Sequence, residues 1–239
     1  MRDTEENRQM IERKIKTVLY AADVTQLEDE KLYAASFEAV SEKRRQKTNR
    51  YRFKKDRNLS LGAELLLQYG LKAAGANGLN DIVYGDSGKP YLKNSNLFFN
   101  LSHSGEYAVC AISQFEVGCD IEKISDRGLK VAKRFFFKDE YENIAAGSTV
   151  EEQSDMFFRY WTMKESFMKV TGLGMKLPLD SFRIILSPEL SVEQSVDDRS
   201  YSFKEFQNIP GYKCSVCTAG DCSDAELHII DLKKDILRL

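Results

Sequence analysis

The chain contains 239 residues, of which 42% are hydrophobic and 30% are charged, and its formal net charge is −2. This balance excludes an intrinsically disordered protein, and the length suits one large domain or two smaller lobes. The sequence has no run of about 18 apolar residues, so we expect no membrane-spanning helix. Its polar, acidic first six residues predict no signal peptide, and we therefore expect a cytoplasmic protein.

The first half of the sequence alternates between strands and helices. Periodicity and turn residues predict strands at 16–22, 81–84, 98–102 and 107–112 and helices at 28–40 and 59–74, after a helical extension over 1–14. The second half has a strand at 116–123, helices at 128–136, 138–145 and 151–171, and strands at 182–187, 201–206, 212–219 and 226–231. This mixed order, with adjacent antiparallel strands, predicts an α+β fold.

A basic segment lies between Lys43 and Arg57, where nine lysine or arginine residues accompany a single acid, Asp56. This local excess of positive charge predicts a site for a polyanion or for an acidic partner. A solvent-exposed helical face is the alternative interpretation. We do not expect nucleic acid to be the partner, because the rest of the chain is not basic and lacks an aromatic-rich RNA-binding motif.

Five cysteines, an odd number with irregular spacing, are typical of a reducing compartment. Cys214 and Cys217, followed by Cys222 and His228, are spaced like a set of zinc ligands. However, residues 211–217 are predicted to form a strand, on which side chains three positions apart point to opposite faces. We therefore interpret the cysteines as small buried hydrophobic residues.

Acidic residues recur in one predicted strand and in the long predicted helix. Asp120 and Glu122 are two positions apart, so their side chains point to the same face of the strand. In the helix, Glu165 lies on the same side as Trp161 and Lys169, so this side is not a purely solvent-exposed face. Three converging carboxylates suit a hard cation such as Mg²⁺, with Mn²⁺ as an alternative. Each acid alone is more typical of an exposed strand edge or helix surface.

Four motifs, taken together, resemble those of one known family. They are Gly88-Lys89-Pro90, Phe99-Asn100-Leu101-Ser102-His103-Ser104-Gly105, Gly118-Cys119-Asp120-Ile121-Glu122 and Trp161-Thr162-Met163-Lys164-Glu165-Ser166-Phe167-x-Lys169. Their order and spacing are similar to those of the surfactin-synthetase-activating (Sfp-type) 4′-phosphopantetheinyl transferases, from about Lys16 onward. Cys119 departs from the aliphatic residue usual in that family, and we expect its side chain to face the core.

The resemblance implies transfer of the 4′-phosphopantetheine arm from coenzyme A to a serine of an apo acyl or peptidyl carrier protein, with release of adenosine 3′,5′-bisphosphate. It also implies two similar α+β lobes, residues 1–117 and 118–239, with the active site at their junction. By the same resemblance, Asp120, Glu122 and Glu165 hold Mg²⁺ on the pyrophosphate of coenzyme A. The resemblance also implies that Glu165 lies close enough to accept the proton of the serine, with a metal-bound water as the alternative base.

The resemblance further implies a set of contacts to coenzyme A. Arg44 and Lys47 would bind the 3′-phosphate, and Ser60 would lie near the pyrophosphate. The other predicted contacts are Gly88, Lys89, Pro90, Ser102, His103, Lys164 and Lys169. We interpret Lys169 as a catalytic residue that clamps the pyrophosphate and is a candidate acid for the leaving group, because it follows Glu165 by one helical turn.

Two alternative functions stay open. One is another Mg²⁺-dependent transferase or hydrolase that acts on a nucleotide pyrophosphate without a carrier protein. The other is a non-catalytic module that binds coenzyme A or a carrier protein, although acids that are costly to bury argue against it. We expect a monomer with no nucleic-acid or membrane partner, and we expect the carrier protein to dock near residues 172–178.

Overall fold

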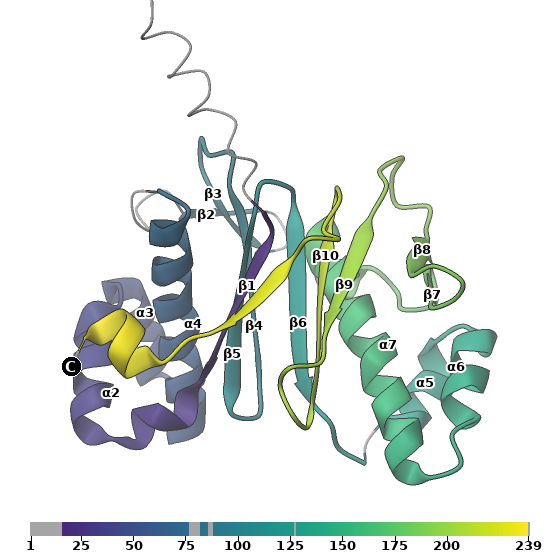
Figure 1. Ribbon diagram of the computed structural model, residues 1–239, viewed down its shortest axis with the longest axis horizontal. Coiled ribbons are helices and arrows are strands. Elements are labelled where there is room, and N and C mark those ends of the chain that lie inside the picture. Colours follow the sequence, from purple (N-terminus) through teal and green to yellow (C-terminus); the bar gives the residue numbers. More distant parts are fainter. Residues whose placement is uncertain (1–15, 77–81, 86–87, 127, 239) are drawn as a thin grey trace, which may run out of the picture.

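The computed structural model describes residues 16–76, 82–85, 88–126 and 128–238 (Figure 1). Two β-sheets lie in the middle of the molecule, with helices α2, α3 and α4 at one end and α5, α6 and α7 at the other. Each sheet and its helices form one α+β half. The predicted fold class, α+β with two lobes, is confirmed.

The N-terminal half begins each of its first two helices at a polar cap. Its elements are β1 (Val18–Asp23), α2 (Glu30–Ala39), α3 (Glu42–Asn49), α4 (Lys54–Ala73), β2 (Ile82–Tyr84), β3 (Pro90–Leu92), β4 (Phe98–Ser104) and β5 (Tyr107–Ser113), with a 3₁₀ turn over Val24–Glu28. The Asp29 side chain accepts a hydrogen bond from Leu32 N, and the Ser41 side chain accepts one from Arg44 N. These acceptors satisfy N–H groups that have no partner within the helix.

The C-terminal half is organised around one long helix, α7. Its elements are β6 (Val117–Lys123), α5 (Leu129–Phe135), α6 (Lys138–Ala145), α7 (Val150–Thr171), β7 (Arg183–Ile185), β8 (Ser191–Glu193), β9 (Ser202–Phe206), β10 (Tyr212–Thr218) and β11 (Glu226–Ile229), with a 3₁₀ turn over Gly174–Lys176 and a π-helical segment over Leu232–Leu237. Gly172 ends α7 with a φ of 74°, a left-handed conformation that glycine adopts without strain.

The two main sheets pack through hydrophobic side chains. The first has the strand order β11-β1-β5-β4, the second has the order β6-β10-β9, and the pairs β2-β3 and β7-β8 form short hairpins. Leu65 and Phe99 belong to a core between α4 and the first sheet. Val109 and Val216 belong to a second core that both sheets share, and Phe167 belongs to a third core around α7.

The C-terminal segment returns to the first half of the chain. Strand β11 pairs in parallel with β1, with Val18 opposite Glu226, and Ile230 and Leu232 are buried in the first core. Figure 1 shows this segment, in yellow, crossing to the end of the molecule that holds α2. The lobe boundary between residues 117 and 118 stays a prediction, but the residues from β11 onward lie with the N-terminal lobe.

Most predicted elements have a counterpart in the structure, with shifted ends. Helix α4 begins at Lys54 rather than at residue 59, because its polar first turn carries no hydrophobic periodicity. Strand β4 continues to Ser104, two residues beyond the predicted strand at 98–102. Strand β8 was not predicted, and the predicted extension over residues 1–14 lies outside the described residues.

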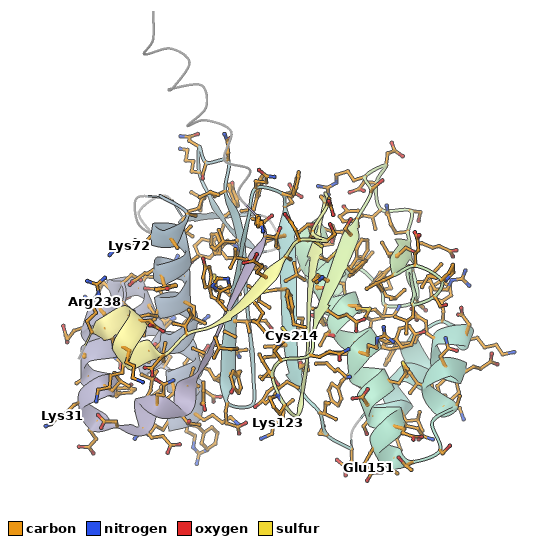
Figure 2. All side chains as sticks on the ribbon, in the orientation of Figure 1. Lys31, Lys72, Lys123, Glu151, Cys214 and Arg238 are labelled. Atoms are coloured by element: carbon orange, nitrogen blue, oxygen red, sulfur yellow. The ribbon has the colours of Figure 1, made fainter. Side chains whose placement is uncertain are left out.

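The cysteines are placed as expected from the strand interpretation. Cys214 and Cys217 lie on β10, and both are buried and unpaired. Figure 2 labels Cys214 within the second sheet. Cys119 is fully buried in the core that the two sheets share, as predicted.

Candidate active site

Strands β4 and β6, one from each sheet, are joined by side chains. Alternate residues of β4, from Asn100 to Ser104, face β6. The bonds run from Cys119 N to Asn100 Oδ1 (2.9 Å), from Ser102 Oγ to Asp120 Oδ1 (2.7 Å) and from Ser104 Oγ to Glu122 Oε2 (2.6 Å). The polar side chains of β4 thus hold two carboxylates of β6 in fixed positions.

A glycine on β6 allows helix α7 to approach the strand closely. A Cβ atom at Gly118 would lie 2.0 Å from Ser166 O, closer than real Cβ contacts ever are. With hydrogen in that place, the helix lies directly on the strand. The amine of Lys169 on α7 therefore reaches β6, where it donates to Asp120 Oδ1 at 2.7 Å and to Cys119 O at 3.1 Å.

A cavity of about 340 Å³ opens where β4, β6 and α7 meet. Its lining consists of Leu101, Ser102, His103, Asp120, Glu122, Trp161, Glu165 and Lys169. All residues that the sequence analysis expected to be catalytic or to hold the metal therefore line one cavity, which we call the acidic pocket. Asp120 and Glu122 also share one face of β6, as their spacing predicts.

The charges of the acidic pocket shift the protonation of its members. Burial raises the pKa of Glu165, and the charges of Asp120 and Glu122 raise it further. Burial also raises the pKa of Glu122. Burial alone would lower the pKa of Lys169, but the neighbouring acidic groups, Asp120 first among them, together outweigh it, so the net shift is upward. The pocket thus holds crowded carboxylates and one firmly protonated amine.

The donor set of the acidic pocket suits a cation. Asp120 Oδ2 is buried and has no hydrogen-bond partner in the described part of the chain, which is costly for a carboxylate oxygen. Within the described residues, no three His, Cys, Asp or Glu side chains are positioned to hold a metal ion together. Lys169 and Ser104 instead engage oxygens of Asp120 and Glu122. The residues fit a hard cation, and these two contacts are the ones it would compete with.

A second cavity, of about 480 Å³, lies next to the first and is basic. Its lining includes Lys43, Arg44 and Lys47 of α3, Arg50 directly after this helix, and Glu64, Tyr84, Pro90 and Leu101. We call it the basic pocket. Leu101 lines both pockets, so they meet at β4. His103 lines the acidic pocket, and its pKa is lowered by desolvation and by the charges of Lys169, Lys47 and Arg44.

Lys164 was predicted to contact coenzyme A, and this prediction is wrong. Its side chain is fully buried, and its amine lies 2.9 Å from Glu140 Oε2 and donates to Leu179 O and Phe182 O. The reason is helical geometry, because a residue adjacent to Glu165 is rotated by about 100° around the helix axis and so faces the core. The lysine and Glu140 form a buried ion pair between α7 and α6.

Three other predicted contacts, Lys89, Ser60 and Gly88, also lie outside the lining of both pockets. The Lys89 amine donates to Val117 O at 3.2 Å and to Val170 O at 3.1 Å, so it ties the turn before β3 to β6 and α7. Ser60 is buried on α4, and its hydroxyl accepts a hydrogen bond from Thr48. Pro90, which follows Lys89 in the sequence, does line the basic pocket.

Several residues of the site were not singled out from the sequence. Asn100 and Ser104 bind β6 beside Ser102, and their alternation along one strand was the available signal. Glu64 lines the basic pocket and bonds to Arg44. An acid on an otherwise apolar face of a helix gives no sign of which cation it will meet.

The fold and the site define a class of protein. An acidic pocket suited to a divalent cation adjoins a basic pocket at the junction of two α+β lobes, an arrangement typical of enzymes that act on phosphate-containing substrates. Among the described helices, none has the length and hydropathy needed to cross a bilayer.

Comparison with known proteins identifies the family. Residues 116–217 match the family model of the 4′-phosphopantetheinyl transferase superfamily, and residues 28–115 match that of the 4′-phosphopantetheinyl transferase N-terminal domain. 4′-Phosphopantetheinyl transferase Sfp of Bacillus subtilis is 37% identical over 186 residues, which cover 75% of this chain and 82% of the relative. The chain therefore belongs to the 4′-phosphopantetheinyl transferase superfamily.

Two further relatives show how far the similarity extends. 4′-Phosphopantetheinyl transferase psf-1 of Bacillus pumilus is 32% identical over 205 residues, or 84% of this chain and 88% of the relative. The human L-aminoadipate-semialdehyde dehydrogenase-phosphopantetheinyl transferase is 40% identical over 111 residues, or 43% of this chain and 35% of the relative. The predicted family is thus confirmed.

Proposed function

We infer that this chain is a 4′-phosphopantetheinyl transferase that transfers phosphopantetheine to carrier proteins. The observation that carries the inference is the 37% identity to the Bacillus subtilis transferase over most of both chains. The site supports it, because two pockets of opposite charge meet at strand β4. A phosphorylated donor requires basic groups for its phosphates and acidic groups for the cation that accompanies them.

We propose coenzyme A as the donor, with its nucleotide in the basic pocket. Arg44 and Lys47 line this pocket and are the groups that would bind the 3′-phosphate, since guanidinium and ammonium groups bind phosphate strongly. The pyrophosphate would then extend past Leu101 toward Ser102, His103 and Lys169 in the acidic pocket.

We propose that the acidic pocket holds Mg²⁺, or Mn²⁺, through Asp120, Glu122 and Glu165. The unpartnered Oδ2 of Asp120 and the crowding of the carboxylates support this proposal. The cation would supply positive charge that orients the pyrophosphate and neutralises the charge that develops on it.

The chemistry asked of the chain's own residues is limited. The serine oxygen of the carrier forms a bond to the phosphorus next to pantetheine, and the bond between that phosphorus and the bridging oxygen breaks. Adenosine 3′,5′-bisphosphate leaves with that oxygen. Glu165 is the group we propose to take the serine proton, and its raised pKa suits a proton acceptor. Lys169 would balance the charge on the pyrophosphate.

We propose that the carrier protein docks near residues 172–178, beyond the end of α7. The support is Met175, whose side chain is 82% exposed next to a helix that lines the acidic pocket. Leu177, the other large apolar residue near the end of this segment, is buried in the core around α7 and is not available for a docking contact. Both lobes of one chain line the site, which supports a monomer, and the cytoplasmic location stays a prediction from composition.

One experiment tests the function. An apo carrier protein is incubated with coenzyme A and Mg²⁺, with and without a chelator, and its mass is measured. We expect the mass to increase by one phosphopantetheine only when the chain and the divalent cation are both present. Coenzyme A cleavage without a carrier would instead favour a nucleotide-pyrophosphate hydrolase. Binding without any cleavage would favour a non-catalytic module.

A further inference from the structure

An acid lines the basic pocket. Glu64 of α4 is only 6% exposed, yet it lies in a cavity whose other charged residues are all lysines and arginines. A carboxylate at this position should weaken the binding of a polyanion if charge alone decided affinity. Its presence there calls for a second effect that favours binding.

The contacts of Glu64 indicate this effect. Its Oε2 accepts a hydrogen bond from Arg44 Nε at 2.9 Å, and its Oε1 accepts one from Ser41 N at 2.6 Å. Arg44 Nη1 also lies 3.5 Å from Ser60 Oγ. Within the described part of the chain, Arg44 Nη2 has no hydrogen-bond partner. One side of the guanidinium is thus anchored to α4, while the other remains for a ligand.

The same carboxylate also fixes the start of α3. Ser41 is the residue before this helix, and its hydroxyl accepts a hydrogen bond from Arg44 N at 3.2 Å. Glu64 therefore holds both the backbone that begins α3 and the arginine one turn into it. An arginine held in this way loses little freedom when a phosphate binds, which strengthens binding.

We propose that Glu64 is a positioning residue that orients Arg44 toward the 3′-phosphate of the nucleotide in the basic pocket. This proposal rests on the proposed function, because it takes the ligand of that pocket to be the nucleotide part of coenzyme A. Under this proposal Glu64 strengthens nucleotide binding, although its negative charge alone would weaken it.

The variant Glu64→Gln shows whether Glu64 strengthens or weakens nucleotide binding. If charge dominates, removing a negative charge should tighten the binding of adenosine 3′,5′-bisphosphate. If Glu64 positions Arg44, the same change should weaken binding about tenfold, since an ordered arginine becomes mobile. Adenosine 5′-monophosphate lacks the 3′-phosphate, so its affinity should change less than about twofold.

A matched control is available on the neighbouring helix. Glu42 pairs with Arg45 at 3.0 Å, but this pair is exposed and Glu42 does not line the basic pocket. Glu42→Gln should leave both affinities unchanged. Calorimetry on the full chain gives the affinities of both nucleotides for wild type and the two variants, and thermal unfolding shows that each variant is folded.

The outcomes separate the proposal from the proposed function. If the wild-type chain does not bind adenosine 3′,5′-bisphosphate, the assignment of the basic pocket fails and the proposal fails with it. If the wild type binds but Glu64→Gln binds equally well or more tightly, only the positioning role is overturned. An equal loss for both nucleotides would also overturn it, since that result indicates general damage to the pocket.

A second variant keeps the proposal testable if Glu64→Gln does not fold. Arg44→Lys keeps the positive charge but cannot bond Glu64 and a phosphate through one planar group. Positioning predicts a loss of about tenfold for the bisphosphate, whereas wild-type affinity would show that charge at this position is sufficient. Where both variants fold, the double variant should bind no more weakly than Arg44→Lys alone, and an additive loss would contradict the coupling.

Discussion

Replacing Lys164 by methionine tests the buried ion pair between α7 and α6. The lysine amine has three partners at 2.9 Å, namely Glu140 Oε2, Leu179 O and Phe182 O, and both charged side chains are almost completely buried. Glu140 also accepts hydrogen bonds from two backbone N–H groups. Removing the amine leaves an uncompensated carboxylate in the core and takes a donor from two carbonyls.

The expected cost of Lys164→Met is about 3–5 kcal/mol in the free energy of unfolding, the range for breaking one side of a buried pair. A total stability of about 5–15 kcal/mol makes this a large fraction. Changing Glu140 to glutamine as well removes the stranded charge and keeps an acceptor for the backbone N–H groups. The double variant should therefore recover about 1–2 kcal/mol.

The assay is urea unfolding followed by two optical probes, together with calorimetry of adenosine 3′,5′-bisphosphate binding. Lys138→Met is the control, because Lys138 is 88% exposed in its pair with Glu142 and should contribute less than about 0.5 kcal/mol. Lys164 lines neither pocket, so nucleotide affinity should be retained in folded Lys164→Met. A stability loss below about 1 kcal/mol, or a tenfold loss of affinity in the folded variant, would refute a structural role.

Three further changes test the other parts of the molecule. Asp120→Asn keeps the shape of a side chain that accepts a hydrogen bond from Lys169 but removes its charge. Transfer, measured by the mass of the carrier, should fall roughly 100-fold or more while the chain stays folded. Near wild-type turnover at limiting Mg²⁺ would contradict the carboxylate site. Lys89→Met should lower stability in urea by about 1–2 kcal/mol, because two carbonyls lose a donor, and should not change the salt dependence of nucleotide binding. Burial lowers the pKa of Lys89 to about 8 from 10.5, so the unfolded chain binds this proton more tightly and wild-type stability should rise relative to the variant as pH increases between these values. Met175→Glu should raise the KM for an acidic carrier protein roughly tenfold with coenzyme A affinity unchanged, and an unchanged carrier KM would place docking elsewhere.

The parts of the site that could be predicted from the sequence depend on local periodicity. Asp120 and Glu122 share a face because a strand repeats every two residues, and Glu165 and Lys169 share a face because a helix turn separates them. The same rule indicates that Lys164 faces away from Glu165. Its place in a motif predicts a contact with coenzyme A, whereas its angle around the helix axis places it in the core.

The parts that could not be predicted depend on contacts between distant segments. Nothing near residue 226 indicates that β11 will pair with β1, some two hundred positions earlier in the chain. Lys89 follows a glycine-rich turn that resembles a phosphate-binding loop, yet its long side chain reaches carbonyls of β6 and α7. Gly118 is required by the backbone of a helix that comes about fifty residues later. Such requirements arise only when the elements are assembled.

The charges of the two pockets explain why both lobes are needed. The acidic pocket contains three carboxylates and one amine, a net charge of −2, which one divalent cation would neutralise. The basic pocket contains four cations and Glu64, a net charge of +3. Opposite charges of this size would attract each other if the side chains were free to move. They stay apart because Glu64 and the Ser60 hydroxyl hold the Arg44 side chain against α4, while Ser102 and Ser104 hold the acids on β6. The rigid strand β4 between them, with Leu101 at the boundary, therefore maintains a separation of charge along which a phosphorylated donor and its cation can be aligned.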